Sequence, residues 1–173
     1  MSTKKMVYLS MLVSLGLALH IAELFMPNPF VGIAPGAKLG LANIIGLITL
    51  VIFGLKYALT VNILRCVIGG LASGAVMSMM YSVAGAIVST LLMWLVYRFF
   101  SKYFSLVGVS IFGALGHNIA QLMVASIIIS NIRIFIYLPV MMLISIFTGF
   151  FIGMTSNFTL KKTELHLKST LRI

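Results

Sequence analysis

One uninterrupted stretch of the chain, residues 66–97, contains no charged side chain at all. A helix needs about 20 apolar residues to cross the hydrocarbon core of a bilayer, so this stretch is too long for one ordinary crossing. The motif GGLASG at residues 69–74 marks the place where we expect a turn, because clusters of glycine and serine favour turns over helix. Residues 66–97 therefore predict the end of one membrane helix, a tight turn and then a second membrane helix.

The rest of the chain has the same apolar character, with 61% hydrophobic and 8% charged residues and a mean hydropathy of +1.18. A soluble domain carries about 25% charged residues, so this composition cannot supply a water-facing surface. We expect an all-α, polytopic membrane protein of six transmembrane helices. The expected spans are residues 6–26, 38–55, 57–75, 77–97, 106–130 and 135–158.

The basic side chains predict the orientation of these spans. If the spans alternate in direction, one side of the membrane receives Lys4, Lys5, Lys56, Arg98, Lys102, Lys161, Lys162, Lys168 and Arg172. The other side receives Lys38 and Arg133. By the positive-inside rule, we expect a multi-pass protein of the bacterial cytoplasmic (inner) membrane with both termini on the cytoplasmic side. A single membrane domain, residues 1–160, is then followed by a basic cytoplasmic tail, residues 161–173, either a short interfacial helix or disordered.

The same distribution explains the formal net charge of +10 without nucleic acid as a partner. Polar side chains inside the spans point to another function, because they are costly in lipid and face a cavity or another helix. The candidates lie at the midplane or nearer the outer face. They are Lys38, Asn43, Arg65, His117, Asn118 and Gln121 as substrate-binding residues, with Glu23 as a possible ion-pair partner of Lys38 or Arg65.

For several candidates a structural role remains open. His117, Asn118 and Gln121 can equally bond between helices, and Glu23 can contact the substrate instead of pairing with a cation. Lys38 and Asn43 are five residues apart, about 140° from each other around a helix, so they do not share one face. We therefore place Lys38 at the rim of the cavity and Asn43 on its wall.

The first span also carries small residues at intervals of four, at Ser14, Ala18 and Ala22. A small-xxx-small ridge of this kind lets another helix approach closely, so these residues are candidates for contact with a partner helix.

Several kinds of chemistry are excluded by what the chain lacks. It contains no aspartate, only Glu23 and Glu164 as acidic residues, and one cysteine, Cys66. It has no P-loop motif for ATP, no carboxylate cluster to hold Mg²⁺ against a diphosphate and no catalytic triad. We expect no metal site, no cofactor and no enzymatic activity of the chain by itself.

Four motifs resemble one family. PGAKLGLANIIGL, LRCVIGGLASG, YSVAGAIVS and SIFGALGHNIAQL are similar to the Gx transporter family, whose members are often labelled heptaprenyl diphosphate synthase component I. The resemblance runs over roughly residues 8–158. This family is regarded as related to the substrate-binding S components of energy-coupling factor (ECF) vitamin transporters. The resemblance implies a six-helix bundle with an outward cavity, a coupling membrane subunit that meets the first helix, and cytoplasmic ATPases.

The leading hypothesis is a subunit that binds a small anionic or amphipathic substrate for ATP-driven uptake. An alternative is a non-catalytic membrane scaffold for an enzyme of isoprenoid or quinone metabolism, as the family label suggests. The scaffold would be non-catalytic because prenyl elongation relies on aspartate-rich motifs, and the chain has no aspartate. A stand-alone secondary transporter needs a protonatable carrier, for which His20, Glu23 and His117 are the candidates.

Overall fold

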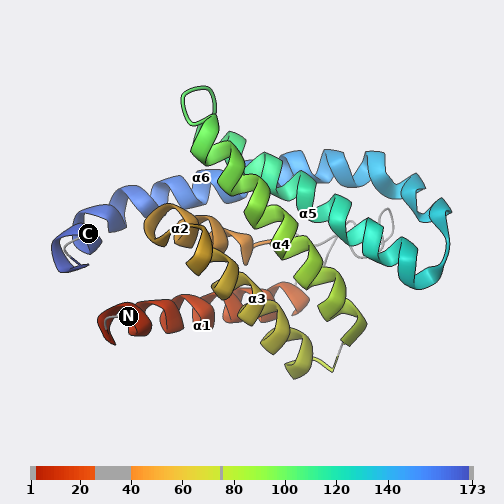
Figure 1. The fold of residues 1–173 in the computed structure, drawn as a ribbon, viewed down its shortest axis with the longest axis horizontal. Coiled ribbons are helices and arrows are strands. Elements are labelled where there is room, and N and C mark those ends of the chain that lie inside the picture. The colour runs from red at the N-terminus through yellow and green to blue at the C-terminus, as the bar shows by residue number, and fades with distance from the viewer. Residues whose placement is uncertain (1–2, 26–39, 75, 172–173) are drawn as a thin grey trace.

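The computed structural model describes residues 3–25, 40–74 and 76–171, and every regular element in these ranges is a helix (Figure 1). This confirms the all-α prediction. The elements are α1 (Thr3–Phe25), α2 (Asn43–Phe53), α3 (Leu55–Ala72), α4 (Val76–Phe99), α5 (Leu106–Ile129), the 3₁₀ helix η1 (Ile132–Tyr137) and α6 (Leu138–Leu171). Within the described ranges, five helices are long and apolar enough to cross a membrane, and α2 is shorter.

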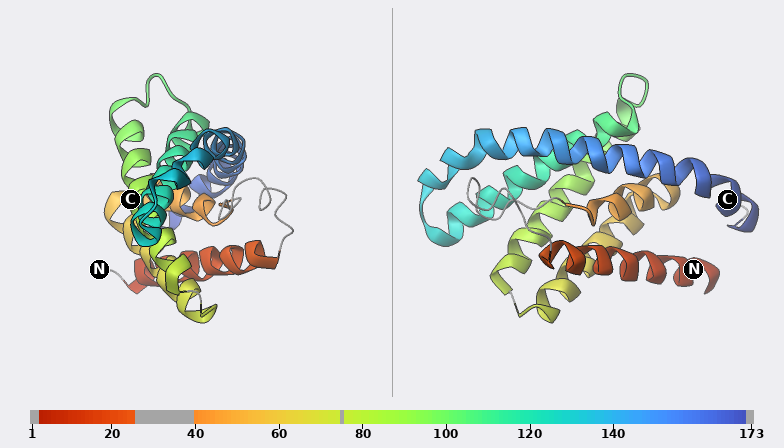
Figure 2. Two further views of the ribbon diagram at one scale, coloured as in Figure 1. Left: turned by 90° about the vertical axis from the view of Figure 1, so that its right-hand side faces the viewer. Right: turned by 180° about the vertical axis from the view of Figure 1, so that it is seen from behind.

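The helices form an elongated bundle. Helices α5 and α6 lie side by side along one edge, α1 runs along the opposite edge, and α3 and α4 cross obliquely between them (Figures 1 and 2). The beginning of α1 and the end of α6 lie at the same end of the molecule in these views. Helix α1 packs on α3 and α2 and is the least buried of the five long helices.

The turn expected in the charge-free stretch is confirmed. Helix α3 ends at Ala72, and the N–H of Ser73 donates to the carbonyl of Gly69. Gly74 follows with φ +66°, a left-handed conformation that glycine adopts without a steric cost. Helix α4 then begins at Val76, so α3 and α4 form an antiparallel pair joined by a very short connection.

The second predicted span, residues 38–55, has a helix of only eleven residues in its described part. Gly40 has φ +73°, and residues 40–42 form a turn in which the N–H of Asn43 donates to the Gly40 carbonyl at 2.8 Å. The helix is therefore about 16 Å long at 1.5 Å per residue, half of a bilayer core of about 30 Å. It begins inside the bundle and runs toward the end that holds the chain termini (Figure 1). The prediction that residues 40–42 are helical is therefore wrong, because Gly40 has a left-handed conformation and the helix begins only at Asn43.

The last span also differs from its expected bounds of 135–158. A 3₁₀ helix occupies residues 132–137, and α6 then continues to Leu171. The basic tail is therefore helical as far as residue 171 and continuous with the last span, in place of a separate interfacial helix or a disordered end.

Two glycines set the distance between α5 and α6. Gly149 and Gly153 lie one turn apart on α6, in the motif GFFIG. A Cβ atom at Gly149 would lie 2.6 Å from the Cα of Ile111, and one at Gly153 would lie 2.5 Å from the Cα of Val107. Backbone thus rests on backbone over a full turn, which is how small residues in a G-xxx-G spacing bring membrane helices together.

Candidate functional site

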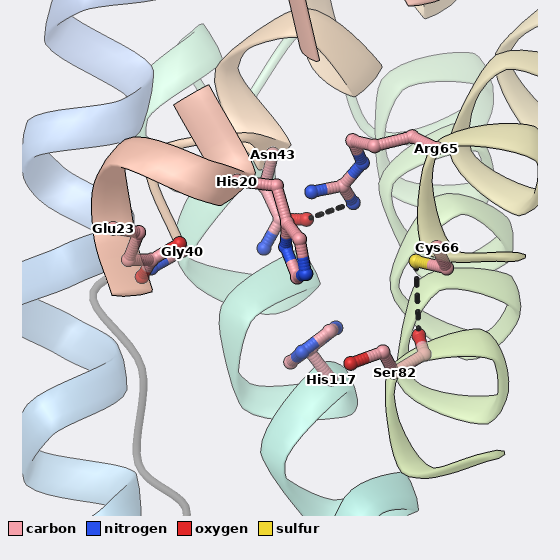
Figure 3. Close-up of a pocket in the computed structure, with 8 residues that line it drawn as sticks. All are labelled: His20, Glu23, Gly40, Asn43, Arg65, Cys66, Ser82 and His117. Carbon is pink, nitrogen blue, oxygen red and sulfur yellow. Dashed lines mark hydrogen bonds between the residues drawn. The ribbon is translucent and has the colours of Figure 1, made fainter. Parts of the chain in front are cut away.

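A small polar cavity lies where α1, α2, α3, α4 and α5 converge (Figure 3). The space within it that a water-sized sphere can reach is about 20 Å³, enough for about one water molecule. The residues that line it are His20, Glu23, Gly40, Asn43, Arg65, Cys66, Ser82 and His117. Ionisable groups are costly inside an apolar helical bundle, so this cavity is the candidate functional site.

Arg65 is the principal charge in this cavity. It lies in the middle of α3 and is 4% exposed. One terminal guanidinium nitrogen donates to the amide oxygen of Asn43 at 3.1 Å, as Figure 3 shows. Its Nε has no hydrogen-bond partner among the described residues. Because this donor is unused, the guanidinium has capacity for an additional acceptor. An additional acceptor would also reduce the cost of burying the cation.

The beginning of α2 forms a second wall. Asn43 is the first residue of α2, and Gly40 lies in the turn that precedes it. The backbone N–H of Gly40 donates to the carboxylate of Glu23, which comes from the last turn of α1. The N-terminal end of a helix carries a partial positive charge, so a carboxylate is favourable at this position.

Two histidines enter the cavity, His20 from α1 and His117 from α5, and each imidazole packs against a glycine of a neighbouring helix. A Cβ atom at Gly69 of α3 would lie 2.7 Å from Cδ2 of His20, and one at Gly85 of α4 would lie 2.8 Å from the ring of His117. Figure 3 shows both imidazoles in the same space, His20 from α1 and His117 from α5. The two glycines therefore provide the room that lets the imidazoles reach the cavity.

The structure brings together Glu23, Asn43, Arg65 and His117, and with them His20, which the sequence analysis named as a candidate proton carrier. Gln121 is buried close to them, because a Cβ atom at Gly85 would also lie 3.1 Å from its Cγ. Gln121 is nevertheless not among the lining residues. Lys38 lies outside the described residues, so its place at the rim stays a prediction.

Asn118 faces α6 and not the cavity. Its side-chain nitrogen donates to Ser145 Oγ at 2.6 Å and to the carbonyl of Met141 at 3.2 Å. These bonds correspond to the interhelical alternative stated for it above.

The cavity also includes residues that were not among the substrate-binding candidates: His20, Gly40, Cys66 and Ser82. The Cys66 thiol donates to the carbonyl of Ser82 at 3.5 Å and joins α3 to α4. A sequence signal existed for His20 and Cys66, since one lies a turn before Glu23 and the other follows Arg65. For Gly40 and Ser82 the sequence offers only small residues, which are usual in membrane helices.

The small residues of α1 face outward. Ser14, Ala18 and Ala22 are all exposed, and an open groove runs along the first half of the helix. Thr3, Met6, Val7, Ser10, Met11, Ser14 and Leu15 line this groove. The ridge is therefore accessible, as the predicted contact with a partner helix requires.

Replacing Asn118 with leucine should lower stability and leave ligand binding unchanged. The substitution removes two buried hydrogen bonds between α5 and α6, and the expected loss is about 1–3 kcal/mol. Thermal unfolding of the purified protein measures this change. Ser126→Ala, which removes an exposed hydrogen bond from the last turn of α5 to the Asn131 carbonyl in the connection that follows it, serves as the control and should have little effect. A loss of binding at full stability would instead place Asn118 on the ligand wall.

The family model described as heptaprenyl diphosphate synthase component I matches residues 12–159. The matched range includes every residue that lines the cavity. No curated protein and no solved structure matches the chain. The match spans most of the 173 residues, and it agrees with the label suggested by the four motifs. The chain therefore belongs to the heptaprenyl diphosphate synthase component I family.

Proposed function

We propose that this membrane protein is the substrate-binding subunit of an ATP-driven uptake system of the ECF type, and that its substrate is a small anionic or amphipathic molecule. The observation that carries the proposal is the buried polar cavity with Arg65 in its wall. A structural helix bundle has no need for an arginine, a glutamate and two histidines around one space, and each of these groups is costly in a membrane.

The position of the cavity suits capture from outside the cell. His20 and Glu23 lie in the last two turns of α1, far along the helix from the end where α1 begins and α6 finishes (Figure 2). With both termini in the cytoplasm, as the basic side chains predict, the cavity lies in the outer half of the membrane. A substrate from outside then reaches the cavity without crossing the whole bilayer.

The outward-facing small residues of α1 favour contact with a partner subunit. Ser14, Ala18 and Ala22 are exposed at one-turn intervals, the pattern that allows close approach of a second helix. The chain itself carries no P-loop motif, so energy from ATP has to come from other subunits. We therefore assign α1 to contact with a coupling membrane subunit that is joined to cytoplasmic ATPases.

Catalysis is not part of this proposal. The family description names a component of a prenyl diphosphate synthase, yet the chain has no aspartate and two glutamates in total. Carboxylate clusters are the usual protein ligands for Mg²⁺ on a diphosphate. We propose that the chain acts as a binding subunit and not as an enzyme.

The α1 contact can be tested with Ala18→Leu. The larger side chain blocks close approach of a partner helix, so co-purification of a coupling subunit and ATPases from native membranes should fall at least about tenfold. Ligand binding by the isolated subunit should persist, because Ala18 is exposed and does not line the cavity.

The matched control is Ala72→Leu, the same substitution at an exposed alanine of α3, which should leave co-purification intact. Recovery of a prenyltransferase in place of ATPases, in both the wild type and the control, would contradict the transport proposal and favour the scaffold alternative.

A further inference from the structure

We infer that the cavity is a carboxylate-binding site in which the side chain of Glu23 holds the place of the substrate's carboxylate. The inference rests on the proposed function and makes it more specific, because it names the group that the site recognises and the internal group that the substrate must displace.

The first observation is the bond between Glu23 and Gly40. The two residues belong to different elements, and the Glu23 carboxylate accepts the Gly40 N–H at the entrance to α2. Gly40 has φ +73°, and a Cβ atom there would lie 3.0 Å from Nδ2 of Asn43. The turn is therefore built so that a backbone donor, at the positive end of a helix, carries a carboxylate.

The second observation is independent of the helix end. Arg65 comes from α3 and is 4% exposed, and its Nε has no hydrogen-bond partner in the described part of the chain. Its bond to Asn43 uses a neutral amide oxygen as acceptor. A guanidinium offers donors in a planar fork that matches a carboxylate, so an anionic acceptor is the group that best satisfies it.

Both donors line the same space, together with Glu23 (Figure 3). This space holds about one water molecule, so a substrate carboxylate cannot be added while the Glu23 side chain remains in place. Repulsion between two carboxylates in a buried site also disfavours joint occupancy. Binding is therefore an exchange: the substrate carboxylate takes the Gly40 donor, in a cavity that Arg65 also lines, and Glu23 leaves the turn.

The exchange connects the site to α1. Glu23 links the last turn of α1 to the beginning of α2, and His20 lies one turn before it on the same helix. Departure of Glu23 from Gly40 releases this link. The outward ridge of Ser14, Ala18 and Ala22 belongs to the same helix. We therefore expect the position of α1, which presents this ridge to the partner subunit, to differ between the substrate-bound and the substrate-free protein.

Glu23→Gln tests the exchange directly. Glutamine keeps the size of the side chain and can still accept from Gly40, but a neutral amide competes less well for these donors and does not repel an anion. Acetate, butyrate and benzoate, titrated into the purified subunit, should bind about tenfold more tightly to this variant than to the wild type. Isothermal calorimetry and the shift in unfolding temperature give the two readouts.

The controls separate charge from site. Glu164→Gln removes the only other acidic group of the chain and should leave the affinities unchanged. Asn43→Asp is nearly isosteric and keeps an acceptor for Arg65, yet it places a carboxylate beside the guanidinium and should abolish binding of all three probes. Acetamide, butyramide and benzamide are the matched neutral probes and should not bind.

The inference is overturned if Glu23→Gln binds the carboxylates no more tightly than the wild type, if the amides bind as well as the acids, or if inorganic phosphate binds more tightly than any carboxylate. These results are distinguishable from failure of the proposed function. Carboxylate binding without co-purified ATPases contradicts the transport proposal alone, and co-purified ATPases without carboxylate selectivity contradict this inference alone.

Discussion

Arg65→Gln is expected to abolish substrate capture, with a loss of affinity of at least about a hundredfold. Arg65 is buried, it is one of the residues that line the cavity, and its Nε donor has no partner among the described residues. Charge-assisted hydrogen bonds in such a setting are among the strong ones, and removal of one partner of a buried charged pair costs about 3–5 kcal/mol. The measurement is the amount of native ligand that remains bound to the protein purified from its own membranes, identified by mass spectrometry.

Two further variants define what this result means. Arg65→Lys keeps the charge but not the planar fork, so we expect partial retention of ligand. Arg98→Gln removes a cation from the exposed last turn of α4 and should retain the wild-type amount. If the ligand is retained fully by Arg65→Ala and also by Lys38→Ala, the proposed polar wall is wrong.

Gly149→Leu should prevent assembly of α5 against α6, and little folded protein should be recovered. A Cβ atom at Gly149 already lies 2.6 Å from the Cα of Ile111, and backbone cannot move aside as a side-chain tip can. Overpacking a well-packed core costs about 1–3 kcal/mol and occasionally more, so we expect about 3 kcal/mol or more here. Yield of monodisperse protein and its unfolding temperature measure the effect.

A milder pair of substitutions makes the comparison quantitative. Gly149→Ala should be clearly less stable than the wild type. Gly116→Ala, on α5, places its Cβ 2.2 Å from Cδ1 of Leu92, which is the flexible end of a side chain that can rotate away. It should therefore be tolerated better than Gly149→Ala. Equal stability of the two alanine variants would show that close backbone contact between α5 and α6 is unimportant.

Much of the fold is predictable from local patterns. The 61% hydrophobic composition requires a lipid environment, and the Gly/Ser motif at residues 69–74 predicts the turn that separates α3 from α4. Arg65 and His117 stand out for a related reason, since an ionisable side chain in an apolar segment has to be compensated by a neighbour or a ligand. Each of these inferences depends on a residue and its immediate surroundings.

Other features depend on contacts between distant segments. Asn118 and His117 are adjacent in the sequence, but α5 directs one toward Ser145 of α6 and the other toward the cavity. Neighbouring residues on a helix point about 100° apart, and the sequence does not say which neighbouring helix lies in either direction. Only the packing of α5 between α4 and α6 distinguishes an interhelical bond from a cavity wall.

The half-length α2 shows the same division. The amino-acid sequence alone determined that residues 38–55 are apolar and belong in a membrane, because hydropathy is a property of composition. That the helix begins only at Asn43, with the Gly40 N–H on the Glu23 carboxylate, was decided by the tertiary structure. A backbone donor inside an apolar bundle has to find an acceptor, and the acceptor here comes from another helix, seventeen residues away. The site is built from such long-range pairings, which periodicity and composition do not encode.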